Sequence, residues 1–188
     1  MIRFLVFAVL LLCVSLSAFG QGKNNSLEGM PLKDRIVTGG GVGLGFGSVQ
    51  DYFSVSPMIG YRLTARLLAG TGVTYRYTNY KIVKPSIKLN DYGVNPFLRF
   101  TFYRNIFLQT EYEYLNYEFP LTITETTRRS FDSFLAGGGF IQPLGERFAF
   151  YMMALYNFSY QEQVHGQYSP YDSPLVIRAG INIGALGL

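Results

Sequence analysis

Apolar and polar side chains alternate with a period of two along most of the chain beyond residue 34, and no segment there shows a convincing helical period. The alternation predicts strands over residues 35–47, 51–62, 65–80, 91–102, 106–118, 130–142, 147–160 and 174–184. Tight turns alternate with longer connections at residues 81–90, 119–129 and 161–173. Short turns at one end and long loops at the other predict an all-β fold, an eight-stranded antiparallel up-and-down transmembrane β-barrel.

The two faces of most predicted strands differ in chemistry. In the segment 91–102, one face carries Tyr92, Val94, Pro96, Leu98, Phe100 and Phe102, and the other carries Gly93, Asn95, Phe97, Arg99 and Thr101. A soluble barrel hides its apolar face inside, whereas a membrane barrel turns that face towards lipid. The segments 130–142 and 147–160 are apolar on both faces, so the alternation leaves their inward side chains undecided.

Charged side chains settle the direction for the other strands. Five of them lie on the polar, glycine-rich face: Arg76, Arg99, Glu111, Glu113 and Arg178. Because an arginine facing the bilayer midplane costs about 2–4 kcal/mol, we expect this face to line the lumen. The interior of an eight-stranded barrel is just wide enough for side chains to fill it. We therefore expect the five charges to pair as a salt-bridge network that plugs the lumen.

The stretch GGGVGLGFG, from Gly39 to Gly47, contains many glycines but no phosphate-binding spacing. It matches neither G-x-G-x-x-G nor G-x-x-x-x-G-K-[ST], and no helical pattern follows it. With a period of two, alternate glycines share one face of a strand. Glycine there indicates close approach by other groups, so we interpret these positions as room for side chains that cross the lumen.

Aromatic residues gather near both ends of the predicted strands. Towards the long loops lie Tyr75, Tyr77, Tyr92, Tyr112, Tyr114, Tyr156 and Tyr160; towards the tight turns lie Tyr61, Phe100, Phe102, Tyr103 and Phe148. Amphipathic rings are enriched at the two interfaces of a bilayer. The two groups therefore predict aromatic belts on either side of a hydrocarbon layer, the alternative being ordinary aromatic residues of a soluble core.

The N-terminal segment predicts export. Arg3 precedes an apolar run, and Ala18 and Gly20 occupy the −3 and −1 positions of a cleavage site before Gln21. We expect a signal peptide over residues 1–20, a flexible leader over 21–33 and the barrel over 34–188; an N-terminal membrane anchor is the alternative. The single cysteine, Cys13, leaves with the signal peptide, so we expect no disulfide and no cysteine-based metal site in the mature chain.

Several segments resemble those of a known group of proteins. The repeats MIGYR and GVTYRY and the late segment VIRAGINIG, together with the signal peptide and alternating strands, are similar to the small outer-membrane β-barrel proteins of the OmpA/OmpX-like type. The resemblance covers residues 35–188. It implies the outer membrane of a Gram-negative-type envelope and insertion by the barrel-assembly machinery. Members of that group usually end on an aromatic residue, whereas this chain ends GALGL.

Candidate chemistry in the loops is sparse. His165 is the only histidine, and a triad would draw on Ser169 with Glu162 or Asp172. Loop proximity alone is weak support for a triad, so we interpret His165 as an exposed loop residue and expect no enzyme, no metal site and no cofactor. Lys81, Lys84 and Lys88 are candidates to contact outer-membrane lipids and lipopolysaccharide, although a solvated loop is the simpler interpretation.

The Thr-rich segment 119–130, FPLTITETTRRS, is prone to form β-structure, which predicts that the fifth and sixth strands extend above the membrane. Such an extension has an edge to which a protein partner can add a strand. The chain has a formal net charge of +4, but its lysines and arginines are scattered, which argues against nucleic acid.

The sequence therefore favours a non-enzymatic structural or surface-interaction protein, alone or as a subunit of a larger outer-membrane assembly. Three alternatives remain open. They are a narrow or gated small-solute pore, a lipid-modifying enzyme that uses His165, and a soluble lipocalin-like binder, which would need the opposite facing of the strands.

Overall fold

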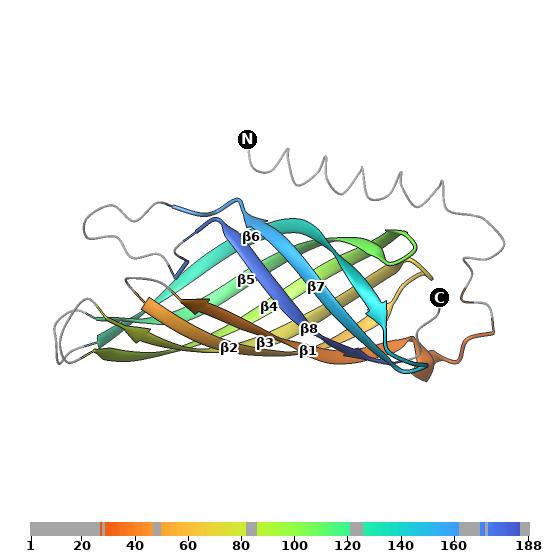
Figure 1. Cartoon of the computed structure of the whole chain (residues 1–188), viewed down its shortest axis with the longest axis horizontal. Coiled ribbons are helices and arrows are strands. Elements are labelled where there is room, and N and C mark those ends of the chain that lie inside the picture. The colour runs from red at the N-terminus through yellow and green to blue at the C-terminus, as the bar shows by residue number, and fades with distance from the viewer. Residues whose placement is uncertain are drawn as a thin grey trace.

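The computed structural model describes residues 27, 29–46, 50–81, 86–120, 126–161, 170–171 and 173–184. These residues form a closed antiparallel barrel in which each strand pairs with the next and the last pairs with the first (Figure 1). The strands are β1 (Ile36–Phe46), β2 (Gln50–Arg62), β3 (Leu67–Tyr80), β4 (Ile87–Tyr103), β5 (Ile106–Pro120), β6 (Thr126–Pro143), β7 (Phe148–Asn157) and β8 (Leu175–Ile183). The predicted eight-stranded up-and-down barrel is confirmed.

A 3₁₀ turn, η1 (Leu32–Arg35), leads into β1. No helix among the described residues is long and apolar enough to cross a bilayer. The predicted signal peptide and most of the predicted leader lie outside the described residues.

The barrel wall is taller on one side than on the other. β4, β5 and β6 contain 17, 15 and 18 residues, whereas β7 and β8 contain 10 and 9. The β5–β6 ladder continues without a break from Ile106↔Phe140 to Pro120↔Thr126, so both strands are longer than predicted from the alternation. Their extension above a membrane stays a prediction. The β6–β7 ladder begins only at Leu135↔Asn157. Among the described residues, the part of β6 before Leu135 pairs with β5, and on its other side it accepts one backbone bond, from the Phe158 N–H to the Phe134 carbonyl oxygen.

The faces of the strands agree with the predicted direction. In β4, Asn95, Phe97 and Arg99 are buried, while Val94 and Leu98 are exposed. The exposed large apolar residues of the other strands follow the same rule and form an apolar outer wall. Its members include Val42, Leu44, Phe53, Ile59, Val73, Leu108, Phe134, Phe140, Met152, Ile177 and Ile181.

The structure settles the facing of β6 and β7, which alternation left undecided. Leu135 on β6 and Tyr151, Met153 and Leu155 on β7 are buried and belong to one interior apolar cluster, joined by Phe107 from β5. Their neighbours along the two strands point outward. Both faces of these strands are apolar because this part of the lumen is itself filled by apolar side chains.

Glycine makes room for an interior side chain where β1 meets β8. Gly41 and Gly180 are paired across this seam, whose ladder runs only from Thr38↔Ile183 to Val42↔Ala179. A Cβ on Gly41 would lie 2.8 Å from the hydroxyl oxygen of Tyr151, and a Cβ on Gly180 would lie 2.6 Å from it. The interpretation of the glycine-rich strand is therefore supported at Gly41.

Candidate functional site

Two carboxylates from one strand form the centre of the lumen. Glu111 and Glu113 are two residues apart on β5, so both side chains point inward, and they are 1% and 0% exposed. Arg178 on β8 reaches both of them. Its Nη1 donates to Glu111 Oε1, and its Nη2 donates to Glu113 Oε1 at 3.1 Å. One guanidinium group thus offsets two buried negative charges, as the geometry of a forked donor permits.

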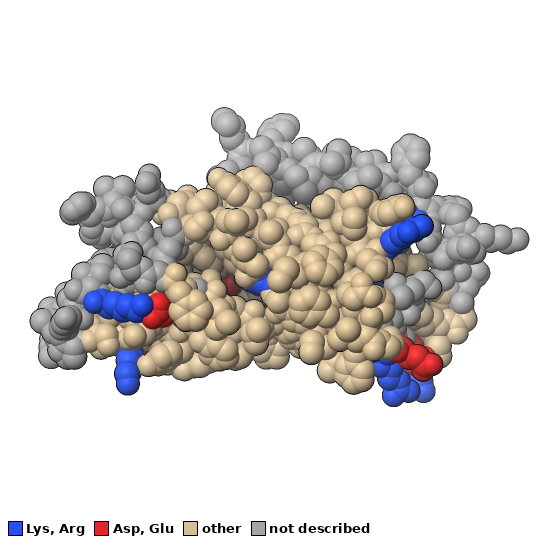
Figure 2. All heavy atoms as spheres, in the orientation of Figure 1, with Lys and Arg blue, Asp and Glu red and all other residues tan. Residues whose placement is uncertain are grey.

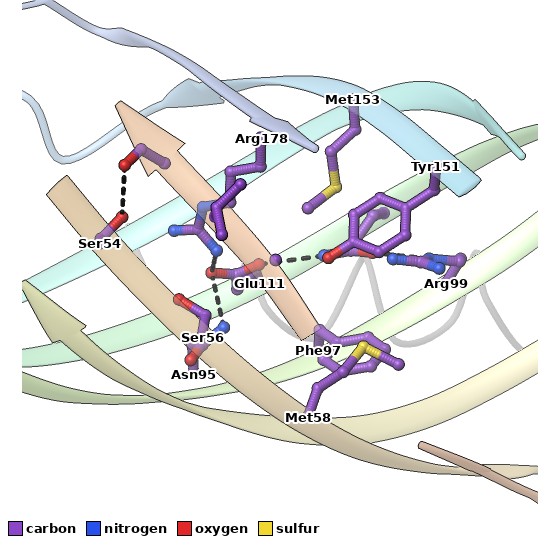
Figure 3. Close-up of a pocket in the computed structure, with 14 residues that line it drawn as sticks. Ser54, Ser56, Met58, Asn95, Phe97, Arg99, Glu111, Tyr151, Met153 and Arg178 are labelled. Carbon is purple, nitrogen blue, oxygen red and sulfur yellow. Dashed lines mark hydrogen bonds and ion pairs between the residues drawn. The ribbon is translucent and has the colours of Figure 1, made fainter. Parts of the chain in front are cut away.

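Amide and hydroxyl groups extend this ion pair across the barrel. Glu111 also accepts hydrogen bonds from Asn95 Nδ2 at 3.2 Å and from Gln109 Nε2 at 3.0 Å. Arg178 and Asn95 approach Glu111 from different strands in Figure 3. Thr74 donates to Asn95 Oδ1 at 3.2 Å and is bonded to Ser56 at 2.9 Å. The network therefore links β2, β3, β4, β5 and β8, and its carboxylates have the several partners that burial demands.

Arg99 occupies a different environment from the one expected. Its Nε donates to Gln109 Oε1 at 2.8 Å, so the link to Glu111 runs through an amide. Its guanidinium lies 4.4 Å from the ring centroid of Phe107 and 4.9 Å from that of Tyr151, with Phe97 at 5.7 Å. Among the described residues Arg99 forms no ion pair, and its buried Nη1 has no hydrogen-bond partner. Aromatic faces and an amide replace the carboxylate there.

Arg76 is held in a similar way near the long-loop end. Its guanidinium lies between the rings of Tyr52, at 5.0 Å, and Tyr171, at 4.8 Å, and its Nη1 donates to the carbonyl oxygen of Pro170 at 2.8 Å. Tyr171 donates its hydroxyl hydrogen to Glu113. The last connection of the chain therefore contributes two residues to the interior network. Of the three arginines expected to pair with Glu111 and Glu113, only Arg178 does so within ion-pair distance in the described part of the chain.

Sequence reasoning missed seven residues of this network, of which Ser56 and Thr74 contribute hydroxyl groups from β2 and β3. Asn95 and Gln109 lie on inward positions of their strands, as does Tyr52, so the period of two was available to find them. Pro170 and Tyr171 belong to a connection without strand periodicity, and no comparable signal marks them. For the strand residues, the sequence signal is an uncharged polar side chain at an inward strand position close to a charged one, and charge alone does not reveal it.

Two small cavities lie between the described side chains of the interior. One cavity of about 30 Å³ is lined by residues that include Ser54, Ser56, Arg99, Glu111 and Tyr151 (Figure 3). A second cavity of about 10 Å³, lined in part by Arg76, Glu113 and Arg178, shares residues with the first. Because a buried water needs roughly 10–15 Å³ of such space, these cavities have room for only a few water molecules.

The aromatic residues of the two predicted belts mostly point outward. Near the long loops, Tyr75, Tyr92, Tyr112, Tyr114 and Tyr156 are exposed and Tyr77 is half-buried; near the tight turns, Phe102, Tyr103 and Phe148 are exposed and Tyr61 and Phe100 are half-buried. The hydroxyl of Tyr112 donates to Asp132 at 2.9 Å, and that of Tyr75 donates to Asn90 at 2.7 Å. Tyr160 differs, since it packs against the interior apolar cluster. Their placement at bilayer interfaces stays a prediction.

Few of the loop candidates fall in the described residues. Lys81 pairs with Asp51 at 2.6 Å, and Lys88 is exposed on β4. Lys84, His165 and the possible triad partners Glu162, Ser169 and Asp172 lie outside them. The described residues contain no group of three or more His, Cys, Asp or Glu side chains able to hold a metal ion.

Comparisons with known proteins add a likeness of fold. No protein-family model matches the chain, and no curated protein sequence is significantly similar to it. Among solved structures, the chain is similar to the N-terminal β-barrel domain of Pseudomonas aeruginosa OprF, with a TM-score of 0.47 and 14% identity over 80% of this chain and 97% of that one. The eight-stranded barrel expected from the sequence is borne out by the strand pairing of the structure itself.

Proposed function

We propose that this chain is a non-enzymatic integral outer-membrane barrel with a closed lumen, serving a structural or surface-interaction role. The observation that carries the proposal is the inverted polarity of the barrel. Large apolar residues cover the outside, while Arg76, Arg99, Glu111 and Glu113 are each no more than 4% exposed on the inside. Figure 2 shows a wall without charged side chains over most of its middle, with charges at the two ends. A lipid environment around the barrel favours this arrangement.

The interior network and the small size of the two described cavities support the proposed closed lumen. Side chains from β3, β4, β5 and β8 meet across the barrel, and the space left between them fits only waters. A solute or hydrated ion would have to break the bonds of Glu111 or Arg178 to pass. Insertion by the barrel-assembly machinery after cleavage near Gly20/Gln21 completes the proposed route to the outer membrane.

A cold-versus-boiled gel shift on the membrane fraction tests the barrel, with trypsin added to intact cells to test its orientation. We expect a heat-modifiable band that trypsin cuts only in the long loops. A protein that stays in solution and shows no shift would refute the proposal and favour the soluble lipocalin-like alternative. In planar bilayers, we expect the purified protein to show no steady conductance.

A narrow or gated pore is the second candidate, because the two interior cavities share Gly43, Ser54, Ser56 and Arg178 and so lie in series. This function predicts ion-selective conductance of the natural protein that changes when Arg99 or Glu111 is neutralised. A lipid-modifying enzyme predicts instead that His165→Ala abolishes turnover of a lipid substrate.

Surface interactions are proposed at the long-loop end, where Lys81, Lys84 and Lys88 would meet phosphates of outer-leaflet lipids or lipopolysaccharide. The tall β5–β6 hairpin offers an edge to a protein partner. Pull-down in mild detergent, with and without deletion of residues 121–125, would show whether a partner depends on this hairpin.

A further inference from the structure

The tight-turn end of the barrel repeats one arrangement in four separate segments. In each, a large exposed apolar side chain and an exposed cation lie one or three positions apart in the sequence. The pairs are Leu32 with Lys33 in η1, Leu63 with Arg66 between β2 and β3, Tyr103 with Arg104 between β4 and β5, and Leu144 with Arg147 between β6 and β7. The four apolar members are 68%, 51%, 57% and 64% exposed. We call these eight residues the rim.

Charge is distributed unequally between the two ends of the described barrel. The tight-turn end has six cations, Lys33, Arg35, Arg62, Arg66, Arg104 and Arg147, and two carboxylates, Asp34 and Glu146. The long-loop end has five cations, Arg76, Lys81, Lys88, Arg128 and Arg129, and four carboxylates, Asp51, Asp91, Glu118 and Asp132. The described tight-turn end therefore carries the larger excess of positive charge.

Arg104 shows that a cation is kept in the rim at some cost. It has a φ of 42°, the left-handed region that glycine or asparagine occupies more easily than arginine. Its guanidinium lies 5.5 Å from the ring centroid of Tyr103, which holds the charge beside the outer wall. The turn thus contains an unfavourable residue whose side chain does nothing for the interior of the barrel.

The rim is continuous with the lipid-facing wall. Ile36, Phe102, Ile106 and Phe148 are exposed in the strands that meet these turns. From the wall to the end of the barrel, the surface therefore changes from apolar, through aromatic, to an apolar side chain with a cation beside it. Such a gradient matches the change from acyl chains to headgroups in one leaflet.

We propose that the rim binds anionic phospholipid headgroups of the leaflet at the tight-turn side, and so fixes the depth of the barrel. Each apolar member reaches the acyl boundary, and each cation meets a lipid phosphate. The four pairs are distributed around the barrel, so only a ligand that surrounds the barrel reaches all of them together. A lipid leaflet does this, whereas an acidic protein partner would cover one side. The inference rests on the proposed membrane function.

The test compares lipids retained by the folded protein in native mass spectrometry, after reconstitution in mixed phosphatidylcholine and phosphatidylglycerol. The variant carries Arg66→Gln and Arg147→Gln. A matched control removes the same charge at the other end, with Arg128→Gln and Arg129→Gln, which are not among the residues proposed to contact outer-leaflet lipids. We expect the natural chain and the control to enrich phosphatidylglycerol, and the rim variant to lose at least about fivefold of that enrichment.

The gel shift separates failure of this inference from failure of the proposed function. If the natural chain gives no heat-modifiable band in either lipid, the membrane barrel itself is refuted. If all three proteins fold and the rim variant retains phosphatidylglycerol as the natural chain does, the rim proposal alone is overturned. It is also overturned if the rim variant loses only a crosslink to a periplasmic protein while its lipid preference is unchanged.

Discussion

Two arginines in the lumen show two ways to keep a cation inside a barrel. Arg178 meets two carboxylates, whereas Arg99 meets three aromatic rings and the amide oxygen of Gln109. Both lie on inward positions of their strands, and their sequence contexts predicted the same role. The difference comes from their neighbours: β8 faces the acidic positions of β5, while Arg99 lies beside the apolar cluster of β5 and β7.

The two sites differ in what would be left behind if the cation were removed. Loss of Arg178 leaves two carboxylates buried without their cation, which is the expensive case for a buried ion pair. Loss of Arg99 leaves one neutral acceptor, Gln109 Oε1, and removes an unpartnered buried donor. Replacing arginine should therefore reduce the unfolding free energy much more at position 178 than at position 99.

Arg178→Met should cause the largest loss, about 3–5 kcal/mol of unfolding free energy, because Glu111 and Glu113 then lose their cation. Urea unfolding in detergent micelles, followed by far-ultraviolet circular dichroism, would measure it. The triple variant Arg178→Met, Glu111→Gln, Glu113→Gln should recover most of the loss. A triple variant no more stable than Arg178→Met would contradict the ion-pair account.

Gly41→Ala should cost about 1–3 kcal/mol, because the added methyl group would lie 2.8 Å from the hydroxyl oxygen of Tyr151. This substitution tests the Arg99 site separately from the Arg178 ion pair, because the ring of Tyr151 contacts the Arg99 guanidinium. Adding Tyr151→Phe should recover part of the loss in the same unfolding experiment. Gly40→Ala, on the outward face of β1, serves as the control and should show no recovery with Tyr151→Phe.

Arg99→Met should change the unfolding free energy by no more than about 1 kcal/mol. Methionine fills similar space beside Phe107 and Tyr151, and the lost cation–π contacts are offset by removal of a buried, unpartnered donor. The measurement is the one used for Arg178→Met. A loss as large as that of Arg178→Met would erase the proposed difference between the two sites.

Much of the barrel was predictable because strand periodicity is a local signal. Alternation placed Arg99, Glu111 and Arg178 on the inner face, since successive side chains of a strand point to opposite sides. Alternation did not predict the facing of β6 and β7, where Leu135 and Leu155 line the lumen. Both faces of these strands carry apolar residues, so the two faces do not differ in polarity.

The pairing within the lumen was less predictable than the facing. Which cation meets which carboxylate depends on register around the closed barrel, and β5 and β8 are far apart in sequence. Tyr171 reaches Glu113 from a connection that has no periodicity at all. Long-range register and loop conformation are set only when the whole barrel is assembled. The alternation within single strands therefore could not distinguish the partners of Arg76, Arg99 and Arg178, and it predicted Glu111 and Glu113 as partners for all three.

Glu118 tests how a carboxylate behaves outside the lumen, and its effect should be the smallest. It lies near the tall end of β5 and accepts a hydrogen bond from the Thr126 hydroxyl at 2.7 Å and from the Asn90 N–H at 3.1 Å. The Thr126 bond first, then the Asn90 and Arg128 interactions, hold the pKa of Glu118 below its ordinary value of 4.5 despite slight desolvation. Its stabilising contribution is therefore complete above that value and is lost as the pH falls through the lower, folded-state pKa.

Hydrogen exchange of the β5–β6 hairpin, corrected for the intrinsic pH dependence, would detect this loss. Protection around Thr126 should fall on acidification below pH 4.5 in the natural chain. In the Glu118→Gln variant, the protection around Thr126 should be lower than in the natural chain at neutral pH, and it should be nearly independent of pH over the same range. Because Glu118 is exposed to screening by water, the change should remain confined to the hairpin and leave the barrel intact.

An equal acid sensitivity in the Glu118→Gln variant would show that another group causes the loss of protection. Asp91 would then be the carboxylate to test, because it accepts a hydrogen bond from the Glu118 N–H at 2.9 Å.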